Sequence, residues 1–174
     1  MFNKNTMFKN NSNSNSNSSS KLPCSGIEPS WEPEKWKSNS KYNNCYSYAL
    51  NDHNELRQQK AIPGTDSSGL YTCSRLMEGI KLDHPKTYVG SFDQPCERGF
   101  RKIYAAVADI DDTGENDFHF WRQDQDGLWS HKPGSSQPSR LDANNGNIIN
   151  PELSDRIFEN RAYVNGCGFF CIQR

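Results

Sequence analysis

The sequence predicts a single α+β domain in which a short helix near its start packs on a small antiparallel β-sheet. Three observations support this fold class: a helix-opening segment at Cys45, an alternating apolar run from Phe100 to Asp109, and an aromatic hairpin from Asp117 to Gly134. The chain has 174 residues, which is enough for one domain of ordinary size and a tail.

The chain begins with a low-complexity tract of Asn, Ser and Lys. Such a tract cannot bury enough apolar area to offset its chain entropy, so we expect residues 1–22 to be a disordered tail and residues 23–174 to form the domain. The segment up to Lys41 contains three prolines around Trp31 and Trp36. This density of proline prevents a regular helix and predicts an extended lead-in whose indoles pack on the domain.

Two amphipathic helices are predicted next. Tyr46, Ala49 and Leu50 recur at helical spacing, and Asn43 or Asn44 is a suitable N-cap, which puts Cys45 in the first turn. The second helix is expected to run roughly from residue 67 to residue 79, with an apolar stripe on one face.

The remaining elements are strands and loops. The run from Phe100 to Asp109 alternates as a half-buried strand does, and the chain is expected to close with a strand from Ala162 to Gln173, interrupted near Gly166. Pro151 favours one or two helical turns that begin there.

The hairpin contains two aromatic runs, each with one histidine, on either side of residues 125–127. A two-residue Asp-Gly turn would put His119 and His131 on opposite faces of the sheet. A three-residue loop, with Gly127 in the left-handed bulge position, pairs Trp121 with His131 and places the two histidines diagonally on one face. We expect this second register.

Composition excludes some partners. The net charge of −1 gives no electrostatic case for nucleic acid or for an anionic membrane surface. A membrane span needs roughly 18 apolar residues in a row, and no such run is present. The first residues lack the apolar core of a secretory signal. We therefore expect no nucleic-acid partner, no membrane span and, by default, a cytoplasmic location, with the oligomeric state left open.

The cysteine pattern is consistent with that location. Six cysteines are present: Cys24, Cys45, Cys73, Cys96, Cys167 and Cys171. Without a secretory signal they are predicted to be reduced thiols, and Cys73 is expected to pack as a small apolar group on its helix. On a strand, Cys167 and Cys171 would lie about 13 Å apart, too far for a shared zinc ion or a shared disulfide.

Cys45, His119 and His131 together suggest acyl chemistry. A cysteine at a helix start is exposed to unpaired N–H groups, which favour the thiolate and can bind a developing oxyanion. A strand histidine, His119, can act as base and then as acid. His131 is predicted to orient His119, and Asp117 and Asp126 are rival orienting groups.

The same residues carry a resemblance to a known family. The segments Asn44-Cys45-Tyr46-Ser47-Tyr48-Ala49, Asp117-Phe118-His119 and Trp129-Ser130-His131-Lys132-Pro133-Gly134 resemble those of NlpC-type cysteine peptidases, in the papain-like superfamily. They are also similar to those of a set of bacterial and viral proteins of papain-like appearance. The resemblance covers roughly residues 40–135. It implies a papain-like core in which a nucleophile helix packs on an antiparallel sheet.

The predicted function is thiol-dependent hydrolysis or transfer at an amide bond of a peptide or other amide-containing substrate, with no cofactor and no metal. Cys45, His119 and His131 are the predicted catalytic residues. The predicted substrate-binding residues are Asn44, Tyr46, Trp121 and Trp129. The alternative is a catalytically inactive structural or interaction protein, and a weaker alternative is a zinc protein that uses the three catalytic residues as ligands.

Overall fold

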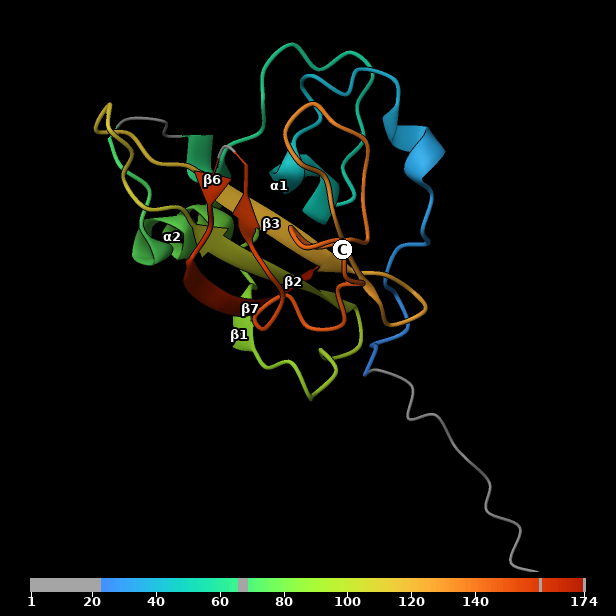
Figure 1. The fold of residues 1–174 in the computed structure, drawn as a ribbon. Coiled ribbons are helices and arrows are strands. Elements are labelled where there is room, and N and C mark those ends of the chain that lie inside the picture. Colours follow the sequence, from blue (N-terminus) through green and yellow to red (C-terminus); the bar gives the residue numbers. More distant parts are fainter. Residues whose placement is uncertain (1–22, 66–68, 160, 174) are drawn as a thin grey trace, which may run out of the picture.

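A computed structural model describes residues 23–65, 69–159 and 161–173 of the chain (Figure 1), so the tail predicted for residues 1–22 lies outside the described residues. The helices and strands of the described residues are, in chain order, η1 (Pro33–Trp36), α1 (Cys45–Ala49), η2 (Pro63–Thr65), α2 (Cys73–Asp83), β1 (Tyr88–Gly90), β2 (Phe100–Val107), β3 (Phe118–Gln123), β4 (Trp129–His131), β5 (Ile157–Phe158), β6 (Arg161–Ala162) and β7 (Asn165–Gln173).

The described strands form a five-stranded antiparallel sheet and a separate two-stranded ribbon. The sheet has the order β1-β7-β2-β3-β4, and the ribbon pairs β5 with β6. The last strand of the chain, β7, therefore lies between β1 and β2, in the interior of the sheet (Figure 1). Because β4 is only three residues long, it pairs with the C-terminal half of β3 and leaves the N-terminal half of that edge open.

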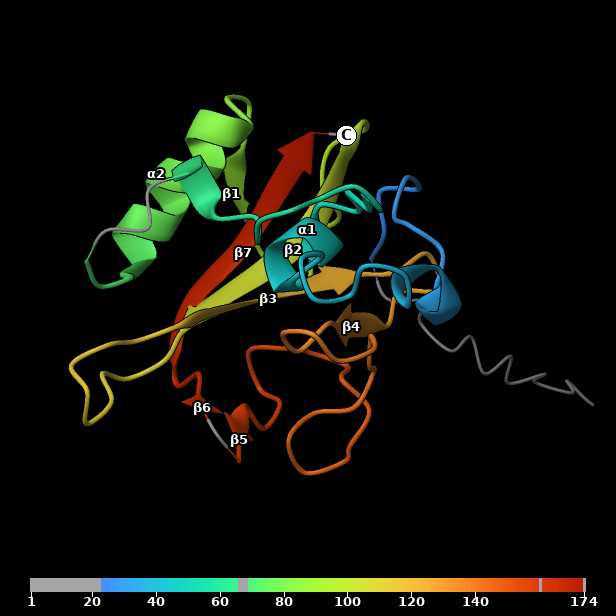
Figure 2. The same ribbon diagram turned by 90° about the horizontal axis from the view of Figure 1, so that it is seen from above.

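The two faces of the sheet are covered differently. Figure 2 shows α1 and α2 on one side, and β5, β6 and the loops before them on the other. The helix side buries a largely aliphatic cluster that includes Leu76, Ile80, Ile103 and Ile172. The loop side buries an aromatic cluster; its members include Tyr104, Trp121, Trp129, Tyr163 and Phe169. Alternation along β2 and β3 supplies both faces.

The predicted fold class is wrong. The described residues form mainly antiparallel sheet, with seven strands, and the α-helices are two short ones of five and eleven residues. They do not build the papain-like core of a nucleophile helix packed on a sheet that the resemblance implied. Two disulfides, absent from the prediction, add covalent cross-links to this sheet.

The first helix is shorter than its apolar pattern suggested. The side chain of Asn44 caps α1 by accepting a hydrogen bond from Ser47 N at 3.2 Å. The helix ends at Ala49 because Asn51 adopts a left-handed conformation (φ 50°), and the N–H of Asp52 then donates to Ser47 O at 2.9 Å. Only one and a half turns remain.

The second helix begins later than expected. Thr72 is its N-cap and accepts a hydrogen bond from Arg75 N at 3.2 Å, so the helix starts at Cys73. It continues past Gly79 to Asp83. Position 79 of this helix is a glycine because η2 packs so closely there that a Cβ would collide with the backbone of Pro63. The helix expected to begin at Pro151 does not form; that segment is a turn.

The predicted hairpin register is confirmed. Trp121 pairs with His131, the N–H of Asp124 donates to Leu128 O at 2.8 Å, and Gly127 adopts the left-handed conformation (φ 88°). The predicted interruption in the last strand is present as a register shift, because Ala105 pairs with Gly168 whereas Ala106 pairs with Gly166.

The predicted reduced state of the cysteines is contradicted for four of the six. Cys73 pairs with Cys167, and Cys96 pairs with Cys171. Cys73 is therefore a cross-link and not simply a packed apolar group. Cys167 and Cys171 do not bond each other, as expected from their spacing on β7; each reaches a different partner across the sheet.

No described helix combines the length and the apolar character that crossing a bilayer requires. The two disulfides do not support the predicted cytoplasmic location, because a reducing compartment disfavours such bonds.

Candidate active site

The N-terminal cap of α1 fixes the position of Cys45. Asn44 extends its side-chain amide to Ala61 O at 2.8 Å while its oxygen caps the helix, so two segments hold it in place. Cys45 follows as the first helical residue, and its backbone N–H has no acceptor within the helix. The sequence prediction that this N–H binds an oxyanion stays a prediction.

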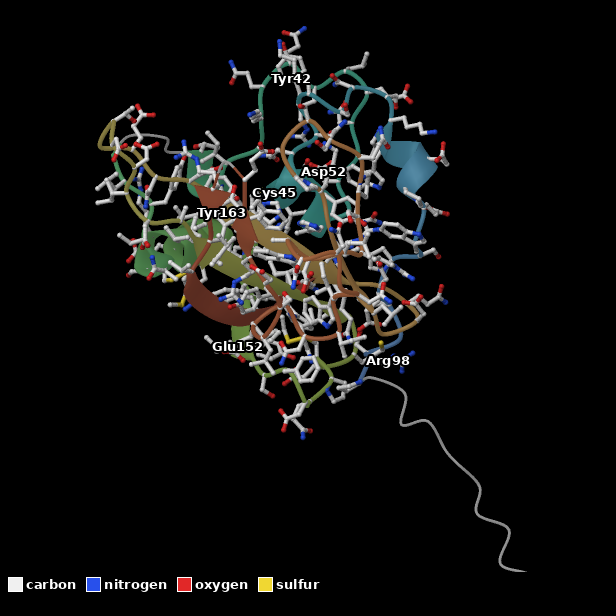
Figure 3. The ribbon with its side chains drawn as sticks, in the orientation of Figure 1. Tyr42, Cys45, Asp52, Arg98, Glu152 and Tyr163 are labelled. Carbon is white, nitrogen blue, oxygen red and sulfur yellow. A yellow bond between two sulfur atoms is a disulfide. The ribbon has the colours of Figure 1, made fainter. Side chains whose placement is uncertain are left out.

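Cys45 lies against the open edge of β3. Its thiol approaches Phe118 O at 3.8 Å, and the side chain is 5% exposed. Cys45 and His119 both line one cavity of about 160 Å³, together with Asp117 and Tyr163. Figure 3 shows Cys45 and Tyr163 close together over this part of the sheet. Both residues thus line one small cavity, and the hydrogen-bond contact of the thiol is with the carbonyl of Phe118. The predicted pairing of this thiol with the His119 imidazole stays a prediction.

The two predicted histidines are hydrogen-bonded. His119 Nε2 lies 2.8 Å from His131 Nδ1, and His131 Nε2 lies 3.0 Å from Leu141 O. A carbonyl can only accept, so His131 Nε2 carries the proton and its Nδ1 accepts from His119 Nε2–H. In this arrangement of neutral rings, Nδ1 of His119 retains a free lone pair. It is therefore the atom equipped to act as a base.

Burial keeps all three groups neutral. Burial, followed by the charge of Asp117, raises the pKa of the Cys45 thiol to about 12. Burial and then the neighbouring His131 hold the pKa of His119 well below its ordinary value, and burial lowers the pKa of His131 to about 4. The position of Cys45 at a helix start predicted a thiolate. A helix of five residues and the N–H groups of Tyr46 and Phe120 do not compensate for the loss of solvent.

Lys132 adds a buried cation near the thiol. Its side chain is fully buried, and its ammonium donates to Ser40 O at 2.8 Å and to Gly134 O at 2.7 Å. Burial lowers the pKa of Lys132 to about 8, whereas a charged Cys45 would raise it. The ammonium in turn lowers the pKa of Cys45 slightly. Lys132 would therefore stabilise a transient thiolate.

The rival orienting groups have other partners. Asp117 accepts hydrogen bonds from the hydroxyl of Tyr163 at 2.9 Å and from Phe118 N at 2.8 Å. Asp126 forms an ion pair with Arg140 at 2.7 Å. The partner of His119 is thus His131. Sequence reasoning missed Tyr163 as part of the cavity, because it comes from the segment between β6 and β7 and nothing near it in sequence marks its role.

The predicted substrate-binding residues occupy different places. Asn44 lines the Cys45 cavity. Tyr46 points away from it, donates its hydroxyl to Asp83 at 2.7 Å and lines a larger neighbouring cavity. Trp121 and Trp129 are buried in the aromatic cluster and are at most 1% exposed. Trp121 packs edge-on against His119 and stacks on His131, which holds both imidazoles in position.

Within the described residues, no group of three or more His, Cys, Asp or Glu side chains is placed to hold a metal ion. Three of the four ring nitrogens of His119 and His131 already take part in hydrogen bonds to each other or to Leu141 O. The zinc alternative therefore gains no support from the geometry.

Comparison with known proteins gives one informative relative. The chain is 30% identical over 136 residues to "Insoluble matrix shell protein 1" of Ruditapes philippinarum, an alignment that spans 72% of this chain and 80% of the relative. No family model matches the chain, and no solved structure matches it. The resemblance to NlpC-type peptidases thus stays a prediction.

Proposed function

We propose that this chain is an extracellular matrix protein with a thiol-dependent amide hydrolase or transferase site. The premise is that the chain belongs to the same family as insoluble matrix shell protein 1 of Ruditapes philippinarum. The extracellular part of the proposal is supported by the two disulfides, since such bonds persist in oxidising surroundings. The catalytic part is supported by the cavity that Cys45 and His119 share.

The proposed reaction begins with a neutral pair. A substrate carbonyl enters the cavity, His119 Nδ1 takes the proton of the Cys45 thiol, and the sulfur attacks the carbonyl carbon. The backbone N–H of Cys45 donates to the developing oxyanion, and the ammonium of Lys132 stabilises negative charge on the sulfur. His131 Nδ1 accepts from His119 Nε2–H throughout, and this bond strengthens when His119 becomes cationic.

The second half of the reaction regenerates the thiol. The carbon–nitrogen bond breaks, the leaving amine takes the proton from His119, and the acyl group remains on Cys45 as a thioester. Water or a second amine then attacks the thioester, gives its proton to His119 Nδ1 and displaces the sulfur, which recovers a proton from the imidazolium. Water completes a hydrolysis, whereas an amine completes a transfer.

One observation carries the proposal: a cysteine without a disulfide partner and an oriented neutral imidazole line the same cavity of about 160 Å³. In the same chain, four other cysteines are oxidised in pairs. Cys45 thus shares a cavity with the proposed base, as general-base activation of a nucleophile requires.

Alkylation of the folded protein by iodoacetamide tests the proposal. Peptide mass spectrometry would give the rate at Cys45, with Cys24 in the same sample as reference. We expect His119→Ala to slow the reaction at Cys45 by about 100-fold, within the range typical of a lost general base. His53→Ala, which changes a histidine outside the cavity, is the matched control and is expected to leave the rate unchanged.

The second candidate is a matrix protein without catalysis, in which Cys45 is a packed core residue. The name of the relative favours it, as does the raised pKa of the Cys45 thiol. The same experiment separates the two candidates. Slow alkylation of Cys45 that does not change in His119→Ala would establish the inert protein and rule out the catalytic site.

A further inference from the structure

The cavity at Cys45 is small and has two larger cavities next to it. A cavity of about 810 Å³ adjoins it on one side and shares Lys60 and Ile62 with it. A cavity of about 450 Å³ adjoins it on the other side and shares His119, Gly134 and Tyr163. The two larger cavities therefore adjoin the proposed reaction centre through shared wall residues. A small cavity with a larger one adjoining it at each of two walls suits an extended chain better than a compact molecule.

The central cavity limits what can sit at the reacting carbonyl. Its volume of about 160 Å³ is bounded by Cys45, Phe118, His119 and Tyr163. Phe118 and Tyr163 are buried and held by neighbouring rings and by the Tyr163–Asp117 hydrogen bond, so these walls are fixed. A small residue such as glycine or alanine fits here with its backbone, and a large side chain does not.

The larger cavity presents a cation. Its acidic side chains are already engaged: Asp52 pairs with Arg57, and Asp83 accepts from Tyr46 and from Gly64 N at 3.0 Å. Lys60 is exposed on the boundary with the central cavity, and its ammonium has no carboxylate within salt-bridge distance among the described residues. A carboxylate on a bound chain could form an ion pair with this ammonium.

The second adjoining cavity has aromatic and apolar residues in its walls, beside the charged residues Glu159 and Arg161. Phe158 is half-buried there, with its ring centroid 6.2 Å from that of Tyr163 and 5.4 Å from that of His131. Pro133 also lines this cavity. An apolar side chain placed beyond the reaction centre would cover Phe158 and remove its exposed surface from water.

We infer that the acyl substrate is an extended polypeptide with a small residue at the reacting carbonyl, an acidic side chain on the Lys60 side and an apolar side chain on the Phe158 side. This inference rests on the proposed function, since it describes the substrate of that same site. Lys60 and Phe158 are then specificity-determining residues, and neither was singled out by the sequence.

Peptidyl vinyl sulfones test the inference, because they place a residue on each side of an electrophilic carbon. We would build them on a central glycine with Glu on one side and Phe on the other, in both orders, together with partners in which Gln replaces Glu or Ala replaces Phe. The rate of adduct formation at Cys45 is measured by intact mass. In one of the two orders, we expect the Glu probe to react about fivefold faster than its Gln partner, as a solvent-exposed ion pair allows.

Variants assign the effect to the named residues. Lys60→Glu should reverse the preference for Glu over Gln, whereas Lys81→Glu, which changes an exposed lysine on α2, should preserve it. Phe158→Ala should slow the Phe probe and leave the Ala probe unchanged. Equal rates for all probes, in a protein whose Cys45 still alkylates in a His119-dependent manner, would overturn this inference and leave the proposed function intact. Loss of that His119 dependence would overturn both.

Discussion

The two regions that contain most of the cysteines use the same side chain in opposite ways. Around β7, Cys167 and Cys171 are oxidised and tie the strand to α2 and to the loop before β2. At the open edge of β3, Cys45 is a buried thiol that lines one cavity with His119. The comparison teaches that surroundings, not residue type, decide the state of a cysteine. A cysteine with a second cysteine across from it forms a cross-link, whereas Cys45, which shares a cavity with His119, stays a thiol.

The largest expected effect comes from removing the disulfide between Cys73 and Cys167. Replacing both Cys73 and Cys167 by serine removes a cross-link between residues 94 apart in sequence, and these side chains are only partly buried, so little packing is lost. Loop-closure entropy predicts a loss of about 4–5 kcal/mol in the free energy of unfolding. Urea denaturation measures it. A loss below about 1 kcal/mol would show that this disulfide contributes little, and alkylation of Cys45 in the folded variant should be unchanged.

Substitutions of His131 test whether this side chain orients His119. His131→Ala removes the acceptor for His119 Nε2–H, and we expect alkylation of Cys45 to slow on the order of 10-fold, as when orienting partners of functional histidines are lost. His131→Asn supplies a side-chain oxygen that can accept the same bond, so it should recover part of the rate. If both variants react like the wild type, His131 has no orienting role.

The neutral histidine pair also predicts how stability depends on pH. Burial lowers the pKa of His131 from 6.5 to about 4. Between these two pH values the side chain is protonated in the unfolded chain but stays neutral in the folded state. This contribution to stability is complete above pH 6.5 and is lost as the pH falls toward 4, by about 3 kcal/mol. His119 shifts in the same direction. Urea midpoints measured between pH 7 and pH 4 test this, and His131→Asn should flatten the dependence.

The smallest expected effect concerns the cap that positions the thiol. Asn44→Ala removes the hydrogen bonds to Ser47 N and Ala61 O and should lower the free energy of unfolding by about 1 kcal/mol. Asn144→Ala, on an exposed loop, should change it by less than about 0.5 kcal/mol. Thermal denaturation of the two variants makes the comparison. Equal losses would mean that the cap does not hold α1.

Local signals were sufficient to predict part of the structure. The three-residue loop and the left-handed Gly127 determine the register of the hairpin, and that register brings His119 and His131 to hydrogen-bonding distance. The strand β2 was predicted from its apolar alternation, and the interruption of β7 from Gly166. In each case the physical cause acts between residues that are close in sequence.

Long-range features were not predictable in the same way. Each disulfide joins residues 75 or more apart, and the sequence does not say which cysteines meet. The pKa of Cys45 depends on burial by segments that are distant in sequence. This burial raises the pKa by more than the N–H groups near the start of the short helix α1 lower it. The fold class failed for a related reason, because helical spacing after Cys45 continues past the point where Asn51 turns the chain.

The protonation of the two imidazoles tests the central claim most directly. Long-range ¹H–¹⁵N correlation spectra of the folded protein at pH 7 distinguish the tautomers of His119 and His131. We expect two neutral rings, both protonated at Nε2, with Nδ1 of His119 free to take the proton of Cys45. A proton on Nδ1 of His119, whether on a neutral or a cationic ring, would contradict it.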